Sequence, residues 1–180
     1  MKDPLEQIIE GCKRGDRRAQ RQLYERFAPE MYALCRRYVR DEQAAEDLVA
    51  EGFYKALTRL HQYEGSGSFE GWLRRIFVNE ALMYLRRQRL QWQSPDEAPP
   101  AALSNRPVAE SRLAAEEILA LLDELPPGYR AVFNLYAIEG FKHREIADML
   151  GISINTSKSQ LLLARKRLQE LLAKRHGYKR

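Results

Sequence analysis

Apolar side chains recur every three or four residues along most of this chain, and that spacing is the strongest limit on its fold. One run consists of Met31, Leu34, Cys35, Tyr38 and Val39. Such spacing gathers apolar residues on one face of an α-helix. A second run follows at positions 45, 48, 49, 53, 56, 57 and 60. Since no stretch alternates with the two-residue period of a strand, the sequence predicts an all-α fold.

Polar residues at helix starts support this reading. Asp16 and Asp41 precede apolar runs, and an aspartate there can accept a hydrogen bond from a free amide of the first turn. Pro29 follows Leu23, Tyr24 and Phe27. Because proline lacks the amide donor and clashes with the preceding turn, we expect Pro29 to interrupt that helix.

A proline-rich stretch divides the chain. The segment QWQSPDEAPPAALSNRPVAE, from Gln91 to Glu110, holds four prolines and no apolar periodicity. Such composition is typical of a linker. The expected organisation is a helical domain at 1–90, a linker at 91–110 and a second helical domain at 111–180.

The second domain carries the pattern of a helix-turn-helix in REIADMLGIS. Ile146, Ala147 and Leu150 are expected to face inward, and Gly151 accepts the positive φ of a tight turn. Ser153 can then serve the N-terminus of a long second helix. That helix, from about residue 155 to the early 170s, is expected to bury Leu161, Leu162, Ala164 and Leu168.

The first turns of this second helix are polar, which suits contact with duplex DNA. Recognition helices present such residues to base edges in the major groove, where Asn and Gln pair with adenine and hydroxyls reach several bases. The candidates for base or phosphate contact are Arg144, Asn155, Thr156, Lys158, Ser159, Gln160 and Arg165. Residues 141–180 hold ten Lys and Arg against three Asp and Glu, as a polyanion-binding segment would. The alternative is ordinary helix capping in a plain helical hairpin.

Two further surfaces are indicated in the first domain. Between Gly67 and Leu90, aromatic residues alternate with arginines, which suits stacking on unpaired bases and phosphate binding. The alternative for each ring is the hydrophobic core, whereas Asn79, a polar residue in an apolar stretch, is expected to need a partner. Upstream, DEQAAEDLVAE holds five acids and no base. That face suits a protein with a basic surface, or is simply a solvated helix face.

Together these motifs resemble one family. AEDLVAEGFYKAL, then FEGWLRRIFVNEALMYLRR, a proline-rich linker and LDELPPGYRAVFNLYAIEGFKHREIADMLGISINTSKSQLLLARKRL are similar, in that order, to bacterial RNA polymerase sigma factors of the extracytoplasmic function (ECF) group. The resemblance covers about Asp16 to Leu172. It implies a sigma domain 2-like helical bundle and a sigma domain 4-like helix-turn-helix, which recognise promoter −10 and −35 elements respectively.

The resemblance also implies roles for individual residues and partners. The acidic helix would dock on the β′ clamp coiled coil of core RNA polymerase through Glu46, Asp47 and Glu51, and domain 4 would read the −35 element and touch the β flap. An anti-sigma factor is a further expected partner. The expected −10 contacts are Ser66, Ser68, Phe69, Trp72, Arg75, Asn79, Arg86 and Arg87.

Two positions depart from the family's usual pattern. Ala50 stands where glutamine often precedes the glutamate of the acidic helix, and SKSQL replaces the frequent VKSRL. One polymerase contact and the promoter sequence therefore cannot be carried over from relatives.

Other classes are disfavoured by the sequence. Cys12 and Cys35 form no CxxC pair and His61, His143 and His176 are scattered, so no metal site, cofactor or enzyme activity is expected. The first residues lack the apolar core of a secretory signal, and no run reaches the roughly 18 apolar residues of a membrane span, so a cytoplasmic protein without membrane insertion is expected. The remaining alternative is an ordinary helix-turn-helix regulator with an unrelated partner-binding domain.

Overall fold

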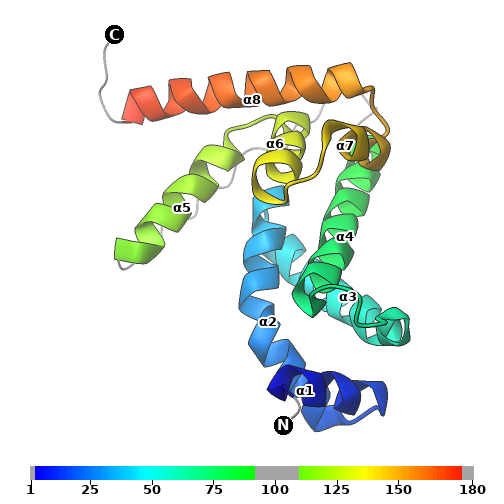
Figure 1. Cartoon of the computed structure of the whole chain (residues 1–180). Coiled ribbons are helices and arrows are strands. Elements are labelled where there is room, and N and C mark those ends of the chain that lie inside the picture. Colours follow the sequence, from blue (N-terminus) through cyan, green and yellow to red (C-terminus); the bar gives the residue numbers. More distant parts are fainter. Residues whose placement is uncertain (1–2, 92–109, 176–180) are drawn as a thin grey trace. The chain divides into compact units, whose positions relative to one another are not determined.

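The computed structural model describes residues 3–91 and 110–175, and its regular elements there are all helical (Figure 1). The all-α prediction is therefore confirmed. The chain forms two compact units that divide between Tyr84 and Leu85, within helix α4. The proline-rich linker predicted at 91–110 falls almost entirely outside the described residues, and the expected domain boundary at residue 90 stays a prediction.

The first unit is built from α1 (Pro4–Lys13), α2 (Arg17–Tyr38), α3 (Glu42–Thr58), the short 3-10 turn η1 (Leu60–Gln62) and the start of α4 (Phe69–Gln91). Asp16 and Asp41 cap α2 and α3 as predicted: Asp16 Oδ1 accepts from the Arg18 amide at 2.8 Å, and Asp41 Oδ1 from the Ala44 amide at 2.7 Å. Each carboxylate accepts a hydrogen bond from a backbone amide that the first turn of a helix leaves without a carbonyl partner.

The predicted interruption of α2 at Pro29 is wrong, because the helix runs unbroken through it from Arg17 to Tyr38. Pro29 lies on the exposed side, where water can bond the carbonyl that loses its amide partner. Phe27 and Met31, on either side of it, are buried in the core. Packing on both sides thus outweighs one missing hydrogen bond.

Helices α3 and α4 cross closely in the core of this unit. A Cβ at Gly52 would lie only 2.5 Å from Phe77 Cε1, so the glycine makes room for the ring. The Phe53 ring packs edge-on against the Phe77 ring, with the two ring centroids 5.2 Å apart. Lys55 Nζ, also on α3, lies 2.5 Å from Oε2 of the buried Glu80 on α4. The two helices are therefore joined by aromatic packing and by a largely buried ion pair.

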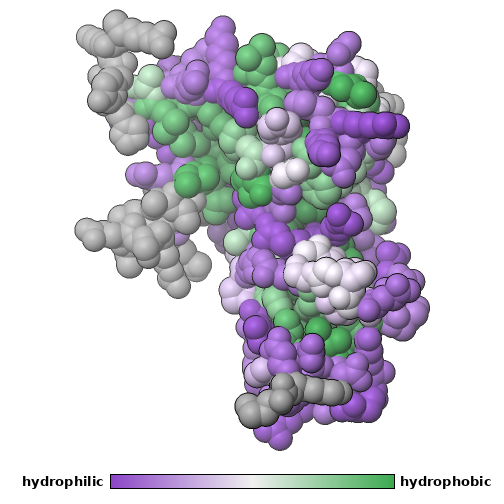
Figure 2. Space-filling model, in the orientation of Figure 1, coloured by the Kyte–Doolittle hydropathy of each residue, from purple (hydrophilic) through white to green (hydrophobic). Residues whose placement is uncertain are grey.

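The second unit contains α5 (Glu110–Asp123), α6 (Pro127–Phe133), the π turn η2 (Asn134–Ile138), α7 (His143–Leu150) and α8 (Ile154–Arg175). Helix α8 packs on α5, α6 and α7. Leu122, Leu125 and Ala164 form a core cluster flanked by Tyr129, Phe133 and Leu168. Pro127 occupies the first turn of α6, where no intrahelical hydrogen bond needs its missing amide. Figure 2 shows apolar surface where α5 and α8 approach each other.

The prediction that α8 buries Leu162 is wrong, since that side chain is 68% exposed. Leu161, Ala164 and Leu171 are buried, and they fix which side of α8 faces the core. At 100° per residue, Leu162 is turned away from that side and lies in line with Asn155 and Lys166.

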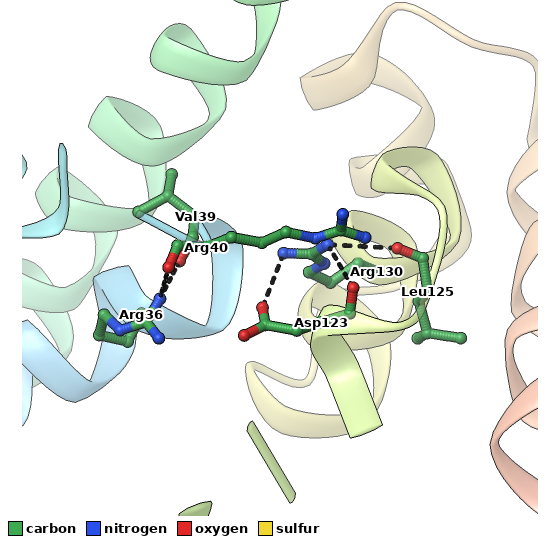
Figure 3. A network of polar contacts seen from close by, with 6 residues as sticks. All are labelled: Arg36, Val39, Arg40, Asp123, Leu125 and Arg130. Atoms are coloured by element: carbon green, nitrogen blue, oxygen red, sulfur yellow. Dashed lines mark hydrogen bonds and ion pairs between the residues drawn. The ribbon is translucent and has the colours of Figure 1, made fainter. Parts of the chain in front are cut away.

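Arg130 closes the turn between α5 and α6 (Figure 3). Its guanidinium lies 3.1 Å from Asp123 Oδ1 and donates to the carbonyls of Asp123 at 3.3 Å and Leu125 at 3.2 Å. In an uninterrupted helix the Asp123 carbonyl would accept from an amide three or four residues on, but Pro126 and Pro127 have none. The buried arginine supplies the missing donors. In the same figure Arg36 donates to the carbonyls of Val39 and Arg40, each at 2.6 Å, at the end of α2.

Candidate interfaces for nucleic acid and protein

The α7–α8 pair has the geometry of a helix-turn-helix. Gly151 adopts φ +65° at the end of α7, in the left-handed region that the prediction required. Ser153 Oγ accepts from the Thr156 amide at 2.9 Å and caps α8. Ile146 and Ala147 are buried, which confirms the predicted inner face of α7, and Leu150 is half-buried.

Most of the predicted contacts at the start of α8 face solvent. Asn155, Lys158 and Ser159 are exposed, as are Arg144 on α7 and Arg165 farther along α8. Asn155, Ser159 and Lys166 lie within about 40° of one another around the helix axis, with Lys158 beside them. They form a polar and basic strip, interrupted by the exposed Leu162, on a helix that a major groove can admit.

Thr156 and Gln160 are half-buried and lie to one side of this strip. Thr156 Oγ1 lies 2.8 Å from Ser153 Oγ, so its hydroxyl serves the helix cap. The Gln160 amide lies over Gly128, 3.2 Å from where a Cβ would be. These two side chains are held by the fold, and direct base contact by either stays a prediction.

Sequence reasoning missed two residues that fix this strip. Ser157 is fully buried, and its Oγ lies 2.9 Å from His143 Nδ1 at the start of α7. The His143 ring is half-buried and stacks on the Tyr136 ring, with the two ring centroids 4.6 Å apart. The Arg165 guanidinium lies 5.7 Å from the centre of the same Tyr136 ring. The i, i+4, i+7 spacing of Ser157 with Leu161 and Ala164 was the available signal.

A second polar surface follows one side of α4. Trp72, Arg75, Asn79 and Arg86 recur at intervals of three, four and seven residues, which places them along one stripe of the helix. Arg75, Asn79, Arg86 and the neighbouring Arg87 are exposed, and Trp72 is half-buried. Asn79 is exposed, so water can satisfy its amide, and the partner expected for it stays a prediction.

Phe69 lies apart from that stripe. Its ring is only 3% exposed and packs against Phe27, Tyr63 and Trp72 at centroid distances of 5.7, 5.2 and 5.5 Å. It therefore belongs to the core, the alternative weighed for every aromatic of this segment. Ser66 and Ser68 are exposed. Ser68 Oγ accepts from the Gly71 amide at 3.1 Å, so this residue caps α4.

The acidic face of α3 is a third surface. Glu46, Asp47 and Glu51 are exposed, and Ala50 and Tyr54 lie on the same side. Glu51 Oε1 is 3.2 Å from Lys55 Nζ, and Asp47 Oδ1 accepts from Gln43 at 3.4 Å. Both side chains are exposed, so they remain available to a basic partner.

Burial raises the pKa of both cysteine thiols. It raises the pKa of Cys35 to about 12, with Arg37 opposing the shift. Burial and then the charge of Asp16 raise the pKa of Cys12. Both thiols therefore stay protonated at neutral pH and are poor nucleophiles.

Across residues 3–91 and 110–175, no helix is long and apolar enough to cross a membrane.

Two family descriptions match the chain. Residues 23–91 match Sigma-70 region 2, and residues 115–168 match Sigma-70 region 4. The first match covers α3, the loop after it and α4, and the second covers the helix-turn-helix.

Individual proteins resemble the chain over most of its length. It is 30% identical to the RNA polymerase sigma-H factor of Pseudomonas aeruginosa, over 93% of each chain. It is 35% identical to the ECF RNA polymerase sigma factor SigE of Mycolicibacterium smegmatis, over 85% of this chain but 61% of that relative.

Solved structures share the fold. The sigma factor RpoE of Bartonella quintana, crystallised with the anti-sigma factor NepR, matches 84% of this chain and 95% of its own with a TM-score of 0.61 and 27% identity. CnrH, solved with the cytosolic domain of CnrY, matches 93% of this chain and 96% of its own with a TM-score of 0.53. Because CnrH is only 24% identical to this chain, the match shows a shared fold alone.

Proposed function

The chain belongs to the sigma-70 family of transcription initiation factors, in its ECF group, and on that premise we propose how its surfaces divide the work. The helix-turn-helix of the second unit binds the −35 element as duplex DNA. The α4 stripe and the loop before it bind the −10 element as it melts. The acidic face of α3 binds core RNA polymerase.

The exposed strip on α8 carries the −35 assignment. Asn155 and Ser159 offer hydrogen bonds to base edges, whereas Lys158, Arg144 and Arg165 offer charge to phosphates. Phosphate contacts supply affinity and register, and base contacts supply sequence preference. The buried Ser157 supports this division, because it fixes the rotation of the helix that presents both kinds of residue.

The α4 stripe supports the −10 assignment through its chemistry. Trp72 offers part of a ring face for stacking, and Arg75, Asn79, Arg86 and Arg87 offer exposed donors to bases and phosphates. A surface that binds unpaired bases and not the duplex shifts the equilibrium toward the melted state. The factor therefore acts by binding energy, and core polymerase performs the chemistry, so we assign the chain no catalytic activity of its own.

Polymerase binding rests on charge. Glu46, Asp47 and Glu51 are exposed acids on one helix face, which suits a basic surface such as the β′ clamp coiled coil and repels DNA. Ala50 cannot make the side-chain hydrogen bonds of a glutamine.

The β flap is the proposed polymerase contact of the second unit. We place this action in the cytoplasm, where bacterial promoters and polymerase meet.

An anti-sigma factor is the further partner that we propose. The support is the 27% identical RpoE, which was crystallised with one. A protein that covered the polymerase-binding or DNA-binding surfaces would hold the factor inactive by competition.

Run-off transcription tests the function directly. Purified sigma-free core polymerase is given fragmented genomic DNA of the source bacterium with and without this protein, and the transcript 5′ ends are sequenced. Starts that require the protein and share two upstream motifs at fixed spacing are expected. Duplex binding without polymerase and no new starts would instead indicate an ordinary helix-turn-helix regulator.

Charge reversal tests the polymerase surface in the same system. Asp47→Lys and Glu51→Lys are expected to weaken binding to core polymerase. Glu25→Lys is the matched control: it also reverses an exposed acid, and its pair with Arg21 is a surface pair of little energetic value. Equal effects of all three substitutions would contradict the assignment to α3.

A further inference from the structure

Helix α1 lies outside the Sigma-70 region 2 match, which begins at residue 23, yet it reaches the loop that precedes α4. Lys13, in the last turn of α1, donates from Nζ to the backbone carbonyl of Tyr63 at 3.2 Å. The two residues are fifty positions apart in the sequence. The contact therefore ties the N-terminal helix to the start of the loop formed by residues 63–68.

Tyr63 in turn holds the other end of that loop. Its hydroxyl donates to the Gly67 carbonyl at 3.0 Å. Its ring packs edge-on against Phe69 at 5.2 Å and at a tilt against Trp72 at 5.6 Å. Phe69 and Trp72 are in the first turn of α4, so the Tyr63 side chain connects the loop to α4, while its backbone carbonyl accepts from Lys13 of α1.

Packing does little to fix the rest of the loop. Glu64, Ser66 and Ser68 are exposed, and Gly65 and Gly67 have left-handed φ values of +79° and +90°. A hollow of about 640 Å³ lies between the loop and α1, with Arg26 and Phe27 of α2 also in its wall. Since the tip has few packed neighbours, the hydrogen bonds of Lys13 and Tyr63 have a large share in setting its shape.

We propose that Tyr63 and Lys13 are positioning residues that hold the 63–68 loop ready for the melted −10 strand, and that α1 is the brace for this loop. This inference rests on the proposed function of the loop in −10 recognition. A loop held in its binding conformation loses less conformational entropy when the strand binds. The net value of one hydrogen bond corresponds to about three- to tenfold in an equilibrium constant.

The variants isolate each contact. Tyr63→Phe keeps the ring and removes the bond to Gly67, and Lys13→Gln removes the charged donor to Tyr63. Lys13→Arg keeps a charged donor and is the rescue variant. Tyr24→Phe is the control for losing a hydroxyl from an exposed tyrosine, and Arg14→Gln is the control for losing one positive charge at the same helix end.

The measurement is the affinity of each holoenzyme for two pre-melted promoter templates, one with the matched −10 sequence found by run-off mapping and one with that sequence scrambled. Core polymerase affinity and thermal unfolding are measured in parallel. We expect Tyr63→Phe and Lys13→Gln to lower the matched-to-scrambled affinity ratio about three- to tenfold, with core affinity unchanged. Lys13→Arg and both controls are expected to keep the wild-type ratio.

Two results would overturn the inference: an unchanged ratio in both variants, or equal losses on the two templates, which a general loss of structure would cause. A wild-type holoenzyme that does not discriminate between the templates would instead count against the proposed function itself.

Discussion

Nδ1 of His143 and Oγ of Ser157 lie 2.9 Å apart and join the first residue of α7 to the end of the first turn of α8. Ser157 is fully buried, whereas its neighbour Lys158 is exposed. The contact therefore fixes both the angle between the two helices and the rotation of α8. The residues proposed to read DNA are placed by one that does not touch solvent.

Ser157→Ala is expected to weaken the joint between α7 and α8. The substitution leaves the half-buried His143 nitrogen without its hydroxyl partner, which costs about 1 kcal/mol. The α7 amides should then exchange their hydrogens faster, by the factor in the opening equilibrium that this free energy corresponds to. Ser159→Ala is the control, because the exposed Ser159 hydroxyl donates only within α8, to the Thr156 carbonyl at 3.0 Å. It should change the free energy of opening by less than about 0.5 kcal/mol. Equal effects of the two substitutions would refute the role of the His143 contact.

Gly52→Ala should destabilise the first unit. The new methyl group would lie 2.5 Å from Phe77, and overpacking of this kind costs about 1–3 kcal/mol. The Gly52→Ala/Phe77→Leu double variant should lose less than the two single changes combined, because the smaller side chain makes room. Urea denaturation measures all four proteins, and strict additivity would show that the two positions do not compete for space.

Lys55→Met should cost about 3 kcal/mol of unfolding free energy, because it leaves the buried Glu80 carboxylate without its cation. Glu51→Gln also removes a contact of Lys55, but its side chain is 51% exposed, and the loss should stay below about 1 kcal/mol. Replacing both Lys55 by Met and Glu80 by Leu should recover most of the loss. A double variant as unstable as Lys55→Met would argue that the pair is not the cause.

Stability at high pH should fall in part through Cys35. Burial raises the pKa of this thiol to about 12 in the folded state, above its ordinary value of 9.0. The unfolded chain therefore releases this proton first, so the thiol's contribution is complete below pH 9.0 and declines as pH rises toward 12. Urea midpoints at pH 8 and 10.5 should differ less in Cys35→Ala than in the wild type. Identical pH slopes would mean that the thiol does not titrate differently on folding.

Lys158→Ala and Asn155→Ala should affect promoter binding differently. Loss of a phosphate-binding lysine weakens binding to all sequences and reduces the salt slope by about 1. Loss of a base-reading asparagine changes preference at one position, at a cost of about 1–3 kcal/mol for the preferred base. Holoenzyme binding to −35 duplexes at several salt concentrations separates these effects. Lys174→Ala, about 24 Å farther along α8, is the charge control and should leave the slope unchanged.

Much of the fold could be predicted because local chemistry and tertiary packing agree. Asp16, Asp41 and Ser153 cap helices, and Gly151 ends one, through interactions within a few residues of each position. The failures occurred where distant packing decides. Pro29 is accommodated because buried residues on both sides of it hold α2 together.

The candidate surfaces could be predicted as helix faces but not residue by residue. Leu162 fits an apolar pattern, yet α8 turns it outward because Leu161 and Ala164 take the core. Phe69 looks like a stacking residue beside arginines, yet its neighbours in space are Phe27 and Tyr63. The Lys13 contact joins residues fifty positions apart, and no local pattern encodes such a separation.

The turn after α5 makes three positions interdependent. Pro126 and Pro127 remove the two amides that could satisfy the Asp123 carbonyl, and the Arg130 guanidinium takes their place. A substitution of the arginine alone removes the guanidinium donor to that carbonyl, and the prolines offer no backbone amide to replace it. In a lineage of such sequences the arginine could be exchanged only after the prolines, so the order in which mutations arrive would decide which of them survive.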